Sequence, residues 1–211
     1  MSKNPKQLTL FPMEEVPVKI RSVNERPAGC RLSSRKGQMG KDFFPTPAWA
    51  TQALTENEPF KGPIWEPACG DGAMVEVLKR RYLVHGSDLF NHGYGDGVRS
   101  KADFLQATTM PHGCVNIITN PPYSLANEFV LHALKLAPCK AAFLLRISFL
   151  EGIWRQKNLF KLHPPARIWV FSERPTFYRK GAQRKGSGTL VYAWFIWDRN
   201  HYGSNEVKWL P

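Results

Sequence analysis

The chain has 211 residues, 43% of them hydrophobic, which suits one domain with a substantial apolar core. Lys and Arg number 29 against 17 Asp and Glu, so the net charge is +12, which favours a polyanionic partner such as nucleic acid over a merely basic soluble protein. We expect a cytoplasmic protein with no signal peptide, membrane span or bound metal, because the cysteines lack zinc-type spacing and the most apolar stretch, residues 141–150, contains Arg146 and is too short to cross a bilayer.

The first 40 residues differ in composition from the rest of the chain. Residues 1–40 are rich in Lys, Arg, Pro, Ser and Gly and have no sustained hydrophobic periodicity, which is typical of an extended or flexible basic arm. An alternation of apolar strands and amphipathic helices follows. It predicts one folded domain at residues 41–200 and a C-terminal tail at residues 201–211.

Several segments of the folded domain have the periodicity of regular structure. In chain order they are a helix at 45–57, a strand at 62–68, a helix at 72–81, strands at 82–88 and 115–119, a helix at 124–137, a strand at 141–147, a helix at 154–163, and strands at 167–171 and 189–197. This alternation predicts an α/β fold, with a mainly parallel sheet covered by helices on both faces. The last strand is a candidate for an antiparallel strand, either at the edge or between two neighbours.

The first candidate site is the sequence WEPACGDG at residues 65–72, between a strand and a helix. Gly70 and Gly72 permit a tight turn and a close approach of the backbone to a ligand. The glycines do not have the spacing of a pyrophosphate-binding loop, and Glu66 would repel a phosphate but attract an ammonium or sulfonium cation. An ordinary tight turn is the alternative.

Two acidic residues follow at positions suited to a bound nucleoside. Asp88 ends the strand at 82–88, where a carboxylate can accept hydrogen bonds from ribose hydroxyls. Asp103 could accept a hydrogen bond from an adenine amino group, while Phe104 packs on the adenine ring. Each Asp taken alone fits a turn cap better, but their order and spacing together favour a nucleoside site.

The second candidate site is TNPPY at residues 119–123, at the end of an apolar strand. An exocyclic aromatic amine is a poor nucleophile because its lone pair is delocalised into the ring, and acceptors for both of its N–H groups improve it. The side-chain oxygen of Asn120 and the carbonyl of Pro121 supply two acceptors, which Pro121 and Pro122 hold in a restricted backbone. Tyr123 offers a flat face on which a base can stack. A strand-ending turn is the alternative.

With these motifs, the chain resembles the S-adenosylmethionine-dependent DNA adenine-N6 methyltransferases. NPPY resembles their catalytic tetrapeptide, EPACGDG their cofactor loop, and DFFPTP at 42–47 their upstream element, which contacts the methionine part of the cofactor. The resemblance covers residues 42–198. It implies a catalytic domain with a Rossmann-like class I methyltransferase fold, a mainly parallel seven-stranded sheet and S-adenosylmethionine as cofactor.

The same resemblance assigns roles to individual residues. Those that it places at the cofactor are Phe44, Thr46, Glu66, Ala68, Gly70, Asp88, Asp103 and Phe104. Those that it places at the target amine are Asn120, Pro121, Pro122 and Tyr123.

The resemblance also implies DNA as the partner, with the target adenine flipped out of the duplex. In the family a later aromatic residue often stacks on the flipped base, and Phe177, with Tyr178 as an alternative, has the corresponding place. No segment fits the sizeable recognition domain that site-specific members usually carry. The candidate for DNA contact is the loop at 173–188, with a solvated hairpin as the alternative. Its basic residues are Arg174, Arg179, Lys180, Arg184 and Lys185.

Other activities are compatible with the same motifs. Some RNA methyltransferases and the protein glutamine methyltransferases also use an Asn-Pro-Pro-Tyr loop, and the charge of +12 favours nucleic acid over protein. Cytosine-N4 enzymes more often have Ser in place of Asn120, so cytosine ranks below adenine. A nucleic-acid-binding module that keeps the fold without chemistry is the alternative from a different class. Neither the target sequence nor the oligomeric state follows from the sequence.

Overall fold

The computed structural model describes residues 45–94, 99–100, 102–136, 138–177 and 190–211. Within these residues the strands are β1 (Ile64–Glu66), β2 (Val84–Asp88), β3 (Arg99–Ser100), β4 (Asn116–Thr119), β5 (Lys140–Arg146), β6 (Arg167–Phe171), β7 (Tyr192–Asp198) and β8 (Glu206–Leu210). The α-helices are α1 (Ala48–Asn57), α2 (Ala73–Leu78), α3 (Ala126–Leu136) and α4 (Ile153–Arg155). Short 3₁₀ or π turns are η1 (Phe104–Gln106), η2 (Tyr123–Leu125), η3 (Ile147–Leu150) and η4 (Gln156–Phe160).

The described strands form one sheet in the order β3-β2-β1-β4-β5-β7-β6-β8. Neighbours from β3 to β5 are parallel, and β7 lies antiparallel between β5 and β6. The predicted mainly parallel sheet is confirmed. The last predicted strand lies between two neighbours, which is one of the two positions expected for it.

The C-terminal segment differs from the prediction of a tail. Residues 206–210 form β8, which pairs in parallel with β6, so the sheet has eight strands in the described residues where seven were expected. The sequence pattern is misleading here because Val207 is 54% and Trp209 67% exposed. The strand is held by backbone pairing with β6, a distant segment, and by the burial of Leu210 in the core.

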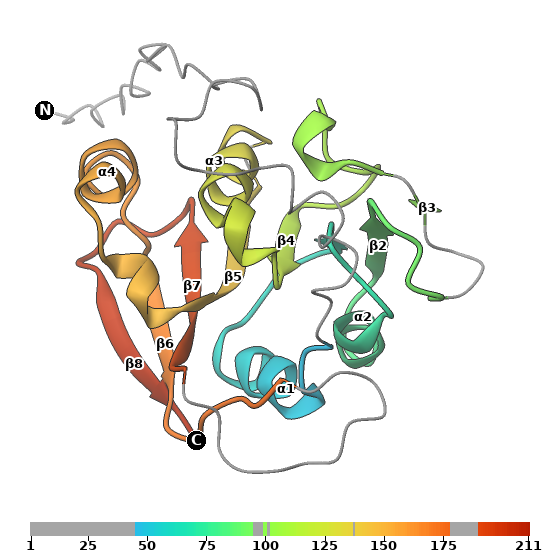
Figure 1. Cartoon of the computed structure of the whole chain (residues 1–211), viewed down its shortest axis with the longest axis horizontal. Helices are drawn as coiled ribbons and strands as arrows, with labels where there is room; N and C mark the ends of the chain where they lie inside the picture. Colours follow the sequence, from blue (N-terminus) through green and yellow to red (C-terminus); the bar gives the residue numbers. More distant parts are fainter. Residues whose placement is uncertain (1–44, 95–98, 101, 137, 178–189) are drawn as a thin grey trace, which may run out of the picture. The chain divides into compact units, whose positions relative to one another are not determined.

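Helices cover both faces of the sheet (Figure 1). On one face α1 and α2 pack Leu54 and Leu78 against the sheet, and on the other α3 packs Phe129 and Val130. Strand β7 contributes alternate residues to the two layers: Tyr192, Trp194 and Ile196 to the first, and Ala193, Phe195 and Trp197 to the second. Because a central strand is buried on both faces, the sequence of β7 is apolar up to its last residue, Asp198.

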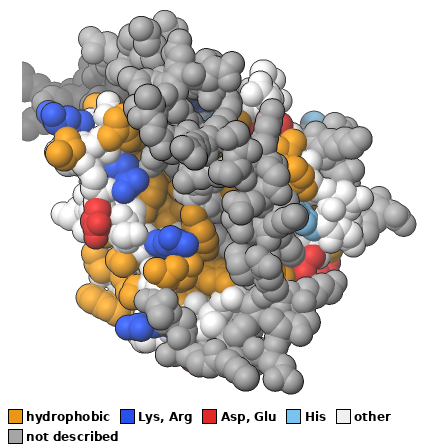
Figure 2. All heavy atoms as spheres, in the orientation of Figure 1, with side chains coloured by type: hydrophobic (Ala, Val, Ile, Leu, Met, Phe, Trp, Pro, Cys, Tyr) orange, Lys and Arg blue, Asp and Glu red, His pale blue; other side chains and the backbone are white. Residues whose placement is uncertain are grey.

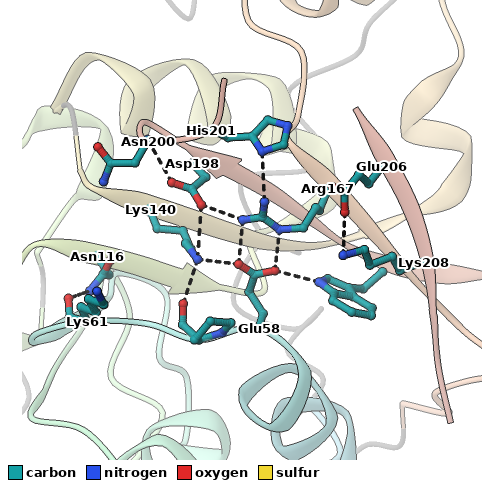
Figure 3. Close-up of polar contacts among 12 residues, drawn as sticks. Glu58, Lys61, Asn116, Lys140, Arg167, Asp198, Asn200, His201, Glu206 and Lys208 are labelled. Carbon is teal, nitrogen blue, oxygen red and sulfur yellow. Dashed lines mark hydrogen bonds and ion pairs between the residues drawn. The ribbon is translucent and has the colours of Figure 1, made fainter. Parts of the chain in front are cut away.

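A buried ion network joins the C-terminal end of α1 to the sheet (Figure 3). Glu58 is 1% exposed and accepts hydrogen bonds from Lys140 Nζ at 2.5 Å, from Arg167 Nε and Nη2 at 2.8 Å each, and from Trp169 Nε1 at 2.9 Å. Asp198 accepts from Arg167 at 2.6 Å. Burial acts to raise the pKa of Glu58, but the bonds from Arg167, Lys140 and Trp169 outweigh it and the pKa lies below its ordinary value. The network therefore anchors α1 on the sheet.

The described surface in Figure 2 carries hydrophobic side chains on the side where β6, β7 and β8 lie, with separate Lys and Arg side chains among them. Its basic side chains are spread rather than gathered in one patch, so this face does not by itself locate a nucleic acid.

No helix in the part of the chain that the structure describes is long and apolar enough to cross a membrane.

Candidate active site

The site lies at the edge of the sheet where the parallel strands end. Strand β1 ends at Glu66, β2 at Asp88, β4 at Thr119 and β5 at Arg146. Strand β7 runs in the opposite direction, so it begins at this edge, with Tyr192 paired to Arg146. Ligands of open α/β sheets bind at this edge. The fold thus brings the two sequence motifs, EPACGDG and NPPY, to the same end of neighbouring strands.

Glu66 is fully buried. Its Oε1 accepts hydrogen bonds from the Thr119 hydroxyl at 2.6 Å and from the Ala68 N–H at 3.2 Å, while Oε2 has no hydrogen-bond partner among the described residues. Burial raises the pKa of Glu66 to about 8; Thr119 and Ala68 oppose this rise, and the charge of Asp88 adds to it. A buried carboxylate oxygen in this state suits a ligand cation or hydrogen-bond donor.

The turn between β1 and α2 is built around two left-handed glycines. Gly70 has a φ of 57° and Gly72 a φ of 84°, a region that favours glycine. Asp88 Oδ2 accepts the N–H of Gly70 at 2.8 Å, and Oδ1 accepts that of Phe90 at 2.8 Å. A Cβ on Gly72 would lie 2.0 Å from the ring of Tyr94. Asp88 thus holds the turn in place, and each of its oxygens keeps acceptor capacity for a ligand hydroxyl.

Asp103 and Phe104 behave more like structural residues than the prediction assumed. Asp103 Oδ1 accepts the N–H of Leu105 at 3.0 Å and caps η1, as the alternative of a turn cap expected. Phe104 is 2% exposed, with its ring 5.2 Å from that of Trp65 and 4.8 Å from that of Phe129. The predicted stacking of Phe104 on an adenine ring is therefore contradicted, because core side chains already cover it.

The NPPY segment leaves the sheet at the end of β4. Asn120 Nδ2 donates a hydrogen bond to Thr46 Oγ1 at 3.0 Å, and Thr46 is 6% exposed. Asn120 Oδ1 is buried, and no hydrogen bond of normal geometry reaches it from the described residues. Pro121 is buried, while Pro122 is exposed and has a φ of −54°. The amide therefore presents an available acceptor at the predicted catalytic position.

An aromatic group adjoins this amide. The ring of Tyr123 lies 5.7 Å from that of Tyr192, which lies 4.7 Å from that of Phe177, so the structure brings the predicted base-stacking residues together. The guanidinium of Arg146 lies 5.0 Å from the centre of the Tyr123 ring. Burial raises the pKa of the Tyr123 hydroxyl, with Tyr192 adding to the rise and Arg146 and Asn120 opposing it. The hydroxyl is therefore neutral near pH 7.

Some predicted residues lie outside the described part of the chain, and others at the site were not predicted. Outside are Phe44, Tyr178, Arg179, Lys180, Arg184 and Lys185. No role was predicted for Thr119, Arg146 or Tyr192, although each stands at the start or end of a strand at the ligand-binding edge. Their positions in the strand pattern, rather than any motif, could have identified them.

Comparison with solved structures identifies the fold. A dimethyladenosine transferase from Plasmodium falciparum matches with a TM-score of 0.53 and 11% identity, over 74% of this chain and 63% of that one. A proposed RNA methyltransferase from Pyrococcus horikoshii matches with a TM-score of 0.54 and 10% identity, over 76% and 89%. The chain has a class I methyltransferase fold. The 23S rRNA methyltransferase ErmE matches with a TM-score of 0.50 and 15% identity, over 76% and 71%.

These likenesses concern the fold. The chain spans less than two thirds of the length of the dimethyladenosine transferase, and the identities of 10–15% are too low to carry activity across. No protein-family model and no curated protein sequence matches the chain.

Proposed function

We propose that the chain transfers a methyl group from S-adenosylmethionine to the N6 amine of adenine in a nucleic acid. The observation that carries this proposal is the Asn120 amide, whose oxygen is buried at the end of β4 without a hydrogen-bond partner of normal geometry in the described structure. An adenine amine has two N–H donors and would use such an acceptor. The class I methyltransferase fold supports the proposal.

The residues present fit S-adenosylmethionine as the cofactor. It carries a sulfonium and an ammonium group, and Glu66 Oε2 is a buried acidic atom without a described partner. Asp88 holds the glycine turn and retains acceptor capacity for ribose hydroxyls. The proposed cofactor residues are Thr46, Glu66, Ala68, Gly70 and Asp88, with Phe44 and Asp103 as further predicted contacts.

The protein's part in the reaction is to hold and activate the amine. When bound, S-adenosylmethionine supplies an electrophilic methyl group. Asn120 Oδ1 accepts one N–H of the adenine amine, and the carbonyl of Pro121 accepts the other, which draws the lone pair out of conjugation. Pro121 and Pro122 restrict the backbone that carries these acceptors. Transfer is direct, without a covalent enzyme intermediate: the methyl–N6 bond forms as the methyl–sulfur bond breaks, and the surplus N6 proton passes to solvent. Tyr123 and Phe177 flank the target base.

Two polymers are candidates. RNA is supported by two of the comparison structures, a 23S rRNA methyltransferase and a proposed RNA methyltransferase; a third is a dimethyladenosine transferase. DNA is the second candidate, because the order of the motifs resembles that of the DNA adenine-N6 methyltransferases. In either polymer the target adenine has to leave its stack. We propose that the predicted catalytic domain, residues 41–200, extends to include β8, which belongs to the same sheet, and that the basic loop at 173–188 contacts phosphates.

A transfer assay tests both the reaction and the polymer. The protein is incubated with labelled S-adenosylmethionine and, separately, with unmethylated duplex DNA, single-stranded DNA and RNA, and each product is digested and identified by mass spectrometry. N6-methyladenine is expected, and the polymer that carries it is the substrate class. No methyl group on any of the three would refute the proposed function.

A variant pair tests the role of the amide. Asn120→Ala should reduce transfer by at least about 100-fold while the Kd for cofactor changes little, because the lost acceptor faces the amine. Asn57→Ala is the matched control, because Asn57 is an exposed residue of α1, and this variant should keep both properties. Retained turnover in Asn120→Ala would refute the role of the Asn120 amide as an acceptor for the substrate amine.

A further inference from the structure

The bond between Thr46 and Asn120 joins two segments of the site. Thr46 precedes Pro47, the N-cap of α1, and its buried hydroxyl accepts the Nδ2–H of Asn120 at 3.0 Å. A residue before proline is restricted to extended backbone, and α1 is anchored at its other end by Glu58. The hydroxyl is thus held at a fixed place beside the amide.

The orientation of the amide decides whether it can serve the reaction. Because Asn120 Nδ2 donates its hydrogen bond to Thr46, Asn120 Oδ1 is the end of the amide that has no partner among the described residues. Rotation of the amide by about 180° would exchange the two ends and present an N–H donor to the substrate amine, which is also a donor. A donor facing a donor cannot activate the amine, so only one orientation is productive.

The hydroxyl can itself accept or donate. If its proton is donated to another acceptor, it can only accept from Asn120, and the productive orientation is then the favoured one. A carboxylate is a strong acceptor of this kind, and the amino-acid part of S-adenosylmethionine carries one. The resemblance of DFFPTP to the upstream element of the adenine-N6 methyltransferases implies that Thr46 faces that part of the cofactor, and one hydroxyl would then link the cofactor to the amide.

We propose that Thr46 is a positioning residue, which holds the Asn120 amide with its oxygen toward the substrate amine, and that the cofactor carboxylate strengthens this orientation. The proposal rests on the proposed function and goes beyond a contact to the cofactor alone. It assigns to Thr46 an effect on turnover in addition to an effect on cofactor affinity.

Three threonine variants test it. Thr46→Val keeps the shape and removes the hydroxyl, and Thr46→Ser restores the hydroxyl. Thr51→Val is the matched control, because Thr51 is a buried threonine of α1 whose hydroxyl has no hydrogen-bond partner in the described structure. The measurements are kcat at saturating cofactor, the calorimetric Kd for S-adenosylmethionine, and the NMR signals of the Asn120 side-chain NH₂ without cofactor and with S-adenosylhomocysteine.

The expected result for Thr46→Val is a fall of about tenfold in kcat, the size of one lost hydrogen bond, with a smaller loss of affinity. Thr46→Ser and Thr51→Val should stay within about threefold of the wild type. The hydrogens of the Asn120 NH₂ should exchange slowly with water in wild type and in Thr46→Ser. Their exchange should be slower still with S-adenosylhomocysteine bound, and it should be rapid in Thr46→Val.

Three outcomes would overturn the proposal: an unchanged kcat in Thr46→Val, a loss confined to cofactor affinity, or NH₂ signals that are the same in wild type and Thr46→Val. If the wild type methylates no polymer, the proposed function fails, and the NMR comparison alone then decides whether Thr46 orients the amide.

Discussion

Cofactor affinity should depend on the ionisation of Glu66. Its pKa is raised to about 8, so near pH 7 only about one carboxyl in ten is charged. If the cationic end of S-adenosylmethionine requires the charged form, the apparent Kd is weakened by that fraction. Between pH 7 and pH 9 the charged fraction rises about tenfold, so the Glu66 contribution alone should tighten the apparent Kd by about tenfold.

Glu66→Gln isolates this contribution. The α-amino group of the free cofactor also titrates near pH 8, but it is already largely protonated at pH 7, so at that pH the difference in proton release between wild type and variant reports chiefly Glu66. Calorimetry from pH 6.5 to pH 9, in buffers of different ionisation enthalpy, should show wild type releasing about 0.9 more proton than Glu66→Gln on binding at pH 7. Equal proton release by the two proteins, together with parallel pH profiles of their Kd, would refute a charged Glu66 in the complex.

The protein without cofactor gives an independent check of the same pKa. The folded-state pKa lies above the ordinary value of 4.5, so the contribution of Glu66 to stability is complete below pH 4.5 and is lost as the pH rises toward 8. Glu66→Gln should therefore gain stability relative to wild type over this range, by a few kcal/mol at most. Thermal unfolding at pH 5 and pH 8.5 measures it, and a constant difference between the two proteins would count against the raised pKa.

Three further substitutions probe the supports of the site. Glu58→Gln removes one of the two carboxylates that pair with the buried Lys140 and Arg167 and leaves Asp198 to face both cations, so unfolding should cost about 3–5 kcal/mol less. In wild type the stability from Glu58 should be lost as the pH falls below 4.5, because its folded pKa is depressed. Thermal melts from pH 3 to pH 7 check both expectations. Asp88→Ala removes the acceptor of the Gly70 N–H and should weaken cofactor binding about tenfold or more in calorimetry. An unchanged affinity would refute the role of Asp88 in cofactor binding. Gly72→Ala places a methyl 2.0 Å from the Tyr94 ring at a φ of 84°, so the melting temperature should fall by an amount equivalent to about 1–3 kcal/mol, and an unchanged melting temperature would show that the turn can relax.

Much of the fold follows from local sequence pattern. The apolar strands alternate with amphipathic helices, and β6 has the same bounds, 167–171, as the predicted strand. Errors occur where a side chain's environment depends on a distant segment. Phe104 follows Asp103 in a pattern that suits an adenine site, but α3 and β1 fill the space around its ring. Nothing in the local sequence indicates which neighbour will cover an aromatic side chain.

In the candidate site, too, the local sequence indicates which residue types are present, while distant segments decide how their side chains are oriented. NPPY and EPACGDG indicate which side chains carry acceptors, but the state of each acceptor is set by contacts across 18 residues for Gly70 and Asp88, 53 for Thr119 and Glu66, and 74 for Thr46 and Asn120. The second and third of these contacts occupy one atom of a side chain and leave its other atom, Glu66 Oε2 or Asn120 Oδ1, without a partner in the described structure. A motif cannot distinguish the occupied atom from the available one, because both belong to the same residue. The chemical capacity of this edge of the sheet therefore depends on long-range hydrogen bonds as much as on the motifs themselves.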